Sequence, residues 1–205
     1  MRMAAVVLAA SMVLPGCYSL SRYPTAERVT RATTVEHDEY EDTTLVKAPE
    51  VWYAMPSRAH TARLEILIPG TGSHTTRLCV YYEGVVLDGG AALLDRATDR
   101  QGNHLETIVI ERQVDYIGAT VPGLGYGVNY QTSYGRTTER VAVELPDGYL
   151  QRSVEAGLDI QLKGQRGSTV VKLPPHYVQG FLAKLNAVLG EPAAEPGALA
   201  AVPNE

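Results

Sequence analysis

The sequence is poor in several kinds of residue, and each shortage excludes a class of protein. Its 205 residues include only two cysteines, Cys17 and Cys79, too few for a framework of disulfides. No apolar run reaches the ~18 residues that cross a bilayer as a helix. The formal net charge of −5 provides no basic excess to displace the counterions of a nucleic acid. We therefore expect no nucleic-acid partner.

What remains is ordinary globular composition. Apolar residues make up 45% of the chain and charged residues 20%, which excludes disorder of the whole chain. This length suits one domain.

The first sixteen residues have the parts of an export signal. Arg2 supplies a positive start, an apolar run follows from Ala4 to Leu14, and the small residue Gly16 precedes Cys17. We expect residues 1–16 to be a signal peptide.

The end of this segment, Leu14-Pro15-Gly16-Cys17, resembles the lipobox of bacterial lipoproteins. That resemblance implies that Cys17 is acylated and becomes the new N-terminus, anchoring the protein to a membrane. Asp after the cysteine favours the inner membrane in enteric lipoproteins. Tyr18 stands there instead, which favours a periplasm-facing position on the outer membrane.

Two polar segments flank the expected domain. Residues 17–42 show no sustained period of 2 or 3.6, and we interpret them as a flexible tether. Their acidic cluster with His37 could hold a hard cation or be a solvated linker. The Ala/Pro/Glu-rich residues 191–205 predict a disordered tail.

Residues 43–190 predict a single β-rich domain. Apolar residues alternate with polar ones over residues 61–68, 140–145 and 158–163. Residues 85–98 and 104–114 are expected to pair across a turn, and residues 158–163 to form a hairpin with residues 169–173. A long loop is expected before Val141.

Two helices are expected among the strands. Residues 147–156 predict a short helix that ends at Gly157, and an amphipathic helix follows Pro174-Pro175 and ends at Gly190. The fold class is thus mainly β, an antiparallel sandwich or half-barrel with the C-terminal helix packed on it.

No catalytic or metal-binding motif is present in the sequence. The five histidines show no zinc spacing, and there is no nucleophile elbow. Cys79 lies in a strand and is expected to be a small buried hydrophobe. We therefore expect no cofactor and no metal.

The most informative segment is residues 122–136. Tyr126, Tyr130 and Tyr134 recur every four residues, which places them on one face of a strand, and Arg136 follows. Such a face is either a contact surface or a hairpin closing over its own core.

Residues 104–185 carry a further pattern, including Gly148-Tyr149-Leu150, Gly157-Leu158-Asp159-Ile160 and Tyr177-Val178-Gln179-Gly180-Phe181-Leu182. This pattern resembles an uncharacterised family of bacterial envelope lipoproteins, which implies no activity and no functional residue.

The sequence favours a non-catalytic binding or assembly module anchored in the envelope, with a protein or glycan partner. Two alternatives stay open. One is a cell-wall hydrolase in which folding brings together carboxylates such as Asp95, Asp99 and Glu106. The other is a purely structural assembly subunit.

Overall fold

The computed structural model describes residues 22–53, 60–70, 73–87, 92–122, 129–165 and 167–190, with the backbone alone for residues 85–87, 116–122 and 129–135. The fold is mainly β, with two antiparallel sheets and a C-terminal helix, as the sequence predicts. The expected signal peptide, Cys17 and the C-terminal tail lie outside the described residues.

The larger sheet has seven strands in the order β1-β2-β4-β5-β9-β8, with β3 paired to β4. It is open, so β1 and β8 form its two edges. Its strands are β1 (Thr34–Asp38), β2 (Thr43–Lys47), β3 (Val51–Trp52), β4 (Thr61–Pro69), β5 (Thr75–Leu87), β8 (Thr107–Pro122) and β9 (Asn129–Leu145).

The smaller sheet has four strands in the order β11-β10-β6-β7. These are β6 (Leu94–Asp99), β7 (His104–Leu105), β10 (Leu158–Gly164) and β11 (Ser168–Leu173). The predicted hairpin of residues 158–173 is confirmed, since Leu158 pairs with Leu173 and Lys163 with Ser168.

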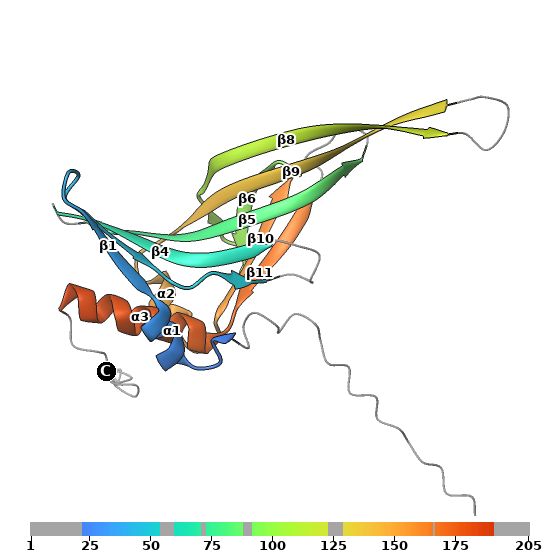
Figure 1. Ribbon diagram of the computed structural model, residues 1–205. Helices are drawn as coiled ribbons and strands as arrows, with labels where there is room; N and C mark the ends of the chain where they lie inside the picture. Colours follow the sequence, from blue (N-terminus) through green and yellow to red (C-terminus); the bar gives the residue numbers. More distant parts are fainter. Residues whose placement is uncertain are drawn as a thin grey trace, which may run out of the picture.

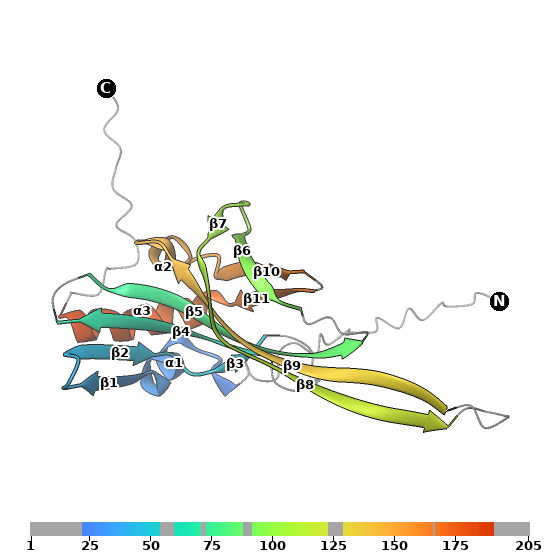
Figure 2. The same ribbon diagram turned by 90° about the horizontal axis from the view of Figure 1, so that it is seen from above.

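Three helices complete the described fold: α1 (Ala26–Ala32), α2 (Tyr149–Arg152) and α3 (Pro175–Leu189). Figures 1 and 2 show α1 and α3 under one part of the seven-stranded sheet, and the smaller sheet under another. No described helix or strand covers the face of the larger sheet opposite these layers; we call it the outer face.

The core follows from alternation along the strands. Leu64, Leu78 and Val143 pair in one row across β4, β5 and β9, and all are fully buried. Helix α3 covers this side with its predicted apolar stripe, in which Tyr177 and Phe181 are also fully buried. The predicted end of α3 is confirmed because Gly190 caps it in the left-handed conformation.

The two sheets are joined through a buried carboxylate. Glu139 on β9 is fully buried between them and accepts hydrogen bonds from the backbone N–H groups of Leu93 and Leu94, each at 2.9 Å. Buried charges in proteins are stabilised only when they are paired and hydrogen-bonded. Glu139 therefore fixes the start of β6 beneath the larger sheet.

The prediction of a flexible tether over residues 17–42 is wrong for residues 26–38, which form α1 and β1. Thr25 caps α1, and Val29 is fully buried against α3. The helix is short and buries one residue, so it leaves no period in the sequence. The folded domain therefore begins well before residue 43.

Three further predictions need correction. The short helix is limited to Tyr149–Arg152, because residues 153–156 form turns before Gly157 adopts a positive φ. β6 pairs with only two residues of β7, while β8 pairs with β9. The long loop expected before Val141 is mostly strand.

Within the described ranges, no helix combines the length and apolar character needed to cross a membrane.

Candidate binding arm and neighbouring cavity

The β8–β9 hairpin extends beyond the rest of the larger sheet. Strand β5 stops pairing with β9 at Leu87, which lies opposite Tyr134. Among the described residues, 129–133 of β9 then pair only with 118–122 of β8. Figures 1 and 2 show this two-stranded end reaching away from both sheets and all three helices. We call residues 118–122 and 129–133 the arm.

The arm has no layer beneath it in the described structure. A two-stranded ribbon is at best marginally stable on its own in water. The arm is therefore stabilised at its root, where β5 adds a third strand. Residues 118–122 and 129–133 pack on no further strand or layer in the described structure. The sixteen residues of β8 also form a sheet edge with no further strand paired to it in the described chain. Such edges offer backbone groups to another chain.

The tyrosines predicted to form a contact face lie on or near the arm. Tyr126 lies outside the described residues. The backbone positions of Tyr130 and Tyr134 belong to the unbroken strand β9, opposite Val121 and Ile117. Strand β9 thus supports the prediction that positions 130 and 134 belong to the same face of one strand. Tyr130 lies where only two described strands pair, and both alternatives, a contact surface and a hairpin closing over its own core, stay predictions.

Arg136, the fourth predicted residue, lies at the root of the arm. Its guanidinium is exposed and forms an ion pair with Glu83 of β5, with Nη2 and Oε2 2.7 Å apart. The hydrogen bond from Arg136 to Glu83 raises the pKa of this arginine above its ordinary value. Arg136 therefore links β9 to β5 where the third strand ends, and its charge is already paired.

The outer face is strongly charged at the end of the sheet that is remote from the arm. One row across four strands alternates in sign, since Lys47 pairs with Glu65, Glu65 with Arg77, and Arg77 with Glu144. Opposite charges in cross-strand positions stabilise a sheet. Arg77 donates to the same oxygen of Glu144 at 2.9 and 3.2 Å. Because these side chains are charged and paired with one another, the outer face is stable in contact with water and needs no covering layer.

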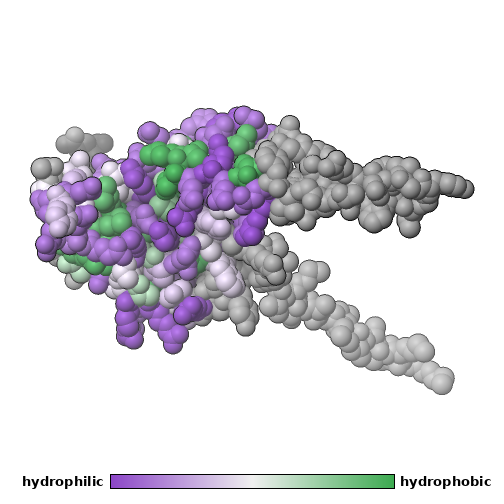
Figure 3. All heavy atoms as spheres, turned by 45° about the horizontal axis from the view of Figure 1, so that its top comes forward, coloured by the Kyte–Doolittle hydropathy of each residue, from purple (hydrophilic) through white to green (hydrophobic). Residues whose placement is uncertain are grey.

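Figure 3 shows this side of the molecule as mostly hydrophilic, with apolar groups scattered among the polar ones. On β8, next to the charged rows, Ile108, Val109 and Ile110 are all exposed, with Ile110 at 58%. The pairing of β8 with β9 shifts register between Val109 and Glu111, which leaves Ile110 unpaired. A bulge of this kind redirects a side chain and interrupts an edge.

Cys79 lies on the outer face and not in the core, which corrects the expectation of a buried hydrophobe. Its thiol donates to Glu65 Oε2 at 3.1 Å. Partial burial, with the adjacent charge of Glu65, raises the pKa of Cys79 to about 12. The thiol therefore stays protonated at neutral pH and is a poor nucleophile.

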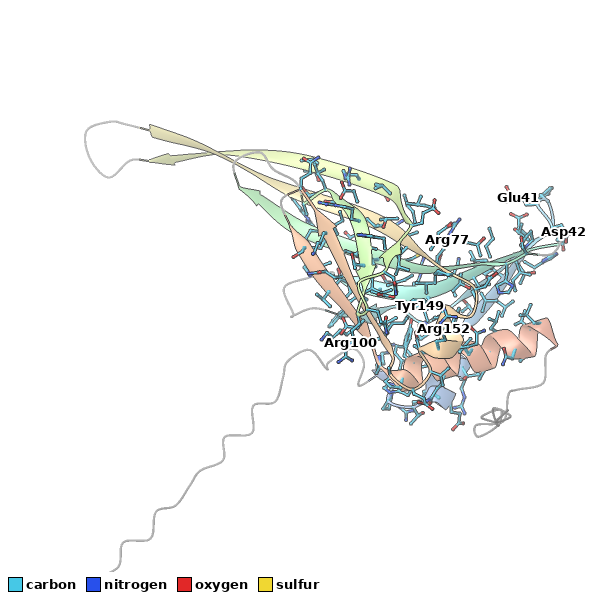
Figure 4. All side chains as sticks on the ribbon, turned by 180° about the vertical axis from the view of Figure 1, so that it is seen from behind. Glu41, Asp42, Arg77, Arg100, Tyr149 and Arg152 are labelled. Carbon is cyan, nitrogen blue, oxygen red and sulfur yellow. The ribbon has the colours of Figure 1, made fainter. Side chains whose placement is uncertain are left out.

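A cavity of about 400 Å³ lies on another side of the molecule, between the β6–β7 turn and α2. Figure 4 shows Arg100, Tyr149 and Arg152 around this region. The guanidinium carbon of Arg152 lies 5.9 Å from the centre of the Tyr149 ring. His104, Asp99 and Asp159 also line the cavity.

The carboxylate of Asp99 is held by its own turn and by Tyr149 of α2. It accepts from the backbone N–H groups of Gln101 and Asn103, from the side chain of Asn103 and from the hydroxyl of Tyr149. Burial acts to raise the pKa of Asp99, but the hydrogen bonds, led by those from Asn103, lower it below its ordinary value. Asp99 is thus an ionised structural group.

The three carboxylates named for the hydrolase alternative do not meet in this cavity. Asp99 lines it, whereas Asp95 and Glu106 do not. Asp95 is exposed beside Arg96. Burial and the nearby Asp99 raise the pKa of Tyr149 to about 12, so its hydroxyl stays protonated at neutral pH. The cavity therefore offers two guanidinium groups, a protonated phenol and two carboxylates, of which Asp99 is held by hydrogen bonds from its own turn.

The acidic cluster of residues 36–42 forms the β1–β2 hairpin and its turn. Asp38 accepts from the backbone N–H groups of Tyr40 and Glu41, and Glu36 pairs with Lys47. His37 shares a hydrogen bond with Thr44. Across the described part of the chain, no group of three His, Cys, Asp or Glu side chains is placed to hold a metal ion.

Comparison with known proteins gives no match to any family model and none to a curated protein.

No pattern in the sequence predicts the two arginines that line the cavity. Arg100 and Arg152 lie 52 positions apart and are brought together by the pairing of β6 with β10 and by α2. No local spacing signals this arrangement. The turn after Asp99 was recognisable from Gly102 and Asn103, but not its contact with Tyr149.

Proposed function

We propose that the protein is a lipid-anchored envelope module that binds a protein or glycan partner through the β8–β9 arm and catalyses no reaction. The anchor is the thiol of Cys17, acylated as its lipobox-like surroundings suggest. The observation that carries the binding role is the two-stranded arm, which extends beyond the sheet without a layer beneath it.

The composition of the arm supports this role. Its sequence and immediate flanks contain Tyr126, Tyr130 and Tyr134. Tyrosine supplies a large contact area with few rotatable bonds and a hydroxyl for hydrogen bonding, and it is enriched at the centre of interfaces. A partner that covers the arm would supply the packing that the arm lacks in the isolated chain.

The free edge of β8 adds a second means of contact. A partner strand that paired with β8 would satisfy its outward backbone groups, as in recognition by strand addition. Exposed Ile108 and Ile110 lie at the start of this edge and would add apolar area. The proposed partner surface therefore runs from the bulge at Ile110 to the end of the arm.

The anchor and the arm are tested separately in cells. Cys17→Ser should move the protein out of the membrane fraction and abolish labelling by a palmitate analogue. A photocrosslinking residue at position 132, in the arm, should capture a discrete partner. The same residue at position 163, exposed on β10, is the matched control.

Either of two results would contradict the proposal. Persistent palmitate labelling of Cys17→Ser would exclude Cys17 as the attachment site. Equal crosslinking from positions 132 and 163 would exclude the arm as the specific contact surface.

A further inference from the structure

The first described residues of the chain pack onto the rest of the domain. The Nε2 atom of His176 on α3 donates to the carbonyl oxygen of Tyr23, 2.9 Å away. Tyr23 also packs against the core. The hydroxyl of Thr30 on α1 donates to the carbonyl oxygen of Gly180 at 2.8 Å. The N-terminal segment is thus part of the folded domain from Tyr23 onward.

This docking limits the distance from the proposed anchor. Only four residues, Tyr18 to Ser21, separate Cys17 from Arg22. Even fully extended, the five Cα–Cα steps between Cys17 and Arg22 span at most about 18 Å. An acylated Cys17 lies at the bilayer surface, so the start of α1 cannot rise far from it. The helical side of the domain is therefore held close to the surface of the bilayer.

The segment that leads into and forms α1 carries a local excess of positive charge. Residues 22–32 hold Arg22, Arg28 and Arg31 against a single acidic residue, Glu27. Arg31 pairs with Glu27, whereas Arg22 and Arg28 are exposed and have no ion pair in the described structure. This positive local charge contrasts with the net −5 of the chain.

The acidic residues that follow lie at the other end of β1. The β1–β2 turn carries Glu39, Glu41 and Asp42, and Figures 1 and 4 place this turn at the far end of β1 from α1. Five residues of β1 correspond to about 17 Å of strand. A negatively charged surface would attract the α1 end and repel this turn.

From these observations we propose that the face formed by Arg22, α1 and the start of α3 docks on anionic lipid headgroups. The proposal rests on the acylation of Cys17 that forms part of the proposed function. Docking in this way turns the uncovered outer face and the arm away from the bilayer, since both lie opposite the helices (Figure 1). The anchor would then orient the binding arm toward a partner.

The test uses the full lipidated protein, purified from membranes and reconstituted into vesicles of phosphatidylcholine and phosphatidylglycerol that contain a nitroxide-labelled lipid. An environment-sensitive fluorophore is attached through Pro24→Cys, beside α1, or through Tyr40→Cys, in the β1–β2 turn. Both variants carry Cys79→Ser. We expect the nitroxide to quench the probe at position 24 several-fold more strongly than the probe at position 40.

A combined variant tests the cause. A Gly/Ser insertion between Ser21 and Arg22, combined with Arg22→Glu and Arg28→Glu, should remove most of the quenching at position 24 without changing the melting temperature. The insertion precedes Tyr23, and all three changes leave in place Tyr23 and Val29, which pack against the core, so folding should be unaffected.

The outcomes separate the two proposals. Mass analysis of the N-terminal peptide shows whether Cys17 is acylated, and a peptide without acyl chains would overturn both. Acylated protein with equal quenching at positions 24 and 40 would overturn the docking face alone. Quenching at position 24 that survives both the insertion and the charge reversals would also overturn it.

Discussion

Glu139 and Arg112 face each other across β9 and β8, and the guanidinium of Arg112 donates to the carboxylate of Glu139 at 3.1 and 3.3 Å. The carboxylate is fully buried, whereas the arginine side chain is 30% exposed. The same carboxylate binds the backbone of Leu93, which holds a positive φ of 52°. Glu139 therefore joins the root of the β8–β9 hairpin to the smaller sheet.

Glu139→Ala should strongly destabilise the protein. The substitution leaves the guanidinium of Arg112 without its acidic partner and the two backbone N–H groups of Leu93 and Leu94 without an acceptor. Leaving a backbone N–H group in the interior without an acceptor costs about 1–3 kcal/mol each, so the loss for the two groups is several kcal/mol. The free energy of unfolding in urea measures the loss.

Glu111→Ala is the matched control on the neighbouring position of β8. Glu111 forms an exposed pair with Arg140 at 3.6 Å, and such pairs contribute about 0–1 kcal/mol. Equal losses for the two variants would mean that Glu139 does not join the sheets.

Gly180→Ala should release α1, although alanine is the better helix former by about 1 kcal/mol. A Cβ atom at position 180 would lie 2.3 Å from the carbonyl oxygen of Ala26 and 2.6 Å from the Val29 side chain. We expect faster amide hydrogen exchange over residues 22–32 and a lower free energy of unfolding.

The control for this helix contact is Ala183→Gly, at an exposed position of α3. It should cost about 1 kcal/mol through helix propensity and leave exchange in residues 22–32 unchanged. Unchanged exchange in Gly180→Ala would show that α1 is not held by this contact, and the short reach from Cys17 would no longer follow.

Asp99 should make the stability of the protein depend on pH in the acid range. Because its pKa is lower in the folded chain, the folded state binds fewer protons than the unfolded state. Its contribution is therefore complete above the ordinary aspartate pKa of about 3.9 and declines as the pH falls below that value. Asp99→Asn should lower the free energy of unfolding at pH 7, and the difference from the wild type should shrink toward pH 3.

Asp95→Asn provides the comparison, because Asp95 is exposed on the same strand. It should change the free energy of unfolding little at either pH. A constant difference between Asp99→Asn and the wild type across this range would contradict the ionised turn.

The parts of the fold that follow local rules could be predicted from the sequence. The stripe of α3 has a period that packing against a sheet requires, and Gly190 ends it. The β10–β11 hairpin has alternating apolar residues on both strands. In these segments the apolar residues recur with the period of a single helix or strand, so the sequence alone predicts which face is buried.

Other features depend on contacts that leave no local pattern. Helix α1 buries one residue and forms against Gly180, far along the chain. Its recognisable signals were Thr25 as a cap and Glu27 in the first turn. Glu139 occupies an inward position of β9, where alternation predicts an apolar residue. Its burial depends on backbone donors from another sheet.

The strand that carries Tyr130 and Tyr134 was predictable, whereas its position in the sheet was not. The spacing of Tyr130 and Tyr134 correctly indicated a strand. The sequence could not show that β5 ends opposite Tyr134 and leaves the rest of the hairpin two-stranded. That difference depends on the relative lengths of three strands.

The most direct measurement for the binding role compares stability and partner contact in Tyr130→Ala. Since Tyr130 lies in the two-stranded arm, its truncation should change the free energy of unfolding by less than about 0.5 kcal/mol. The melting temperature should therefore be nearly unchanged. A central contact residue, in contrast, costs about 2 kcal/mol or more in binding, so photocrosslinking from position 132 to the envelope partner should fall sharply. A drop of several degrees in melting temperature with undiminished crosslinking would contradict the account and show that Tyr130 serves the fold.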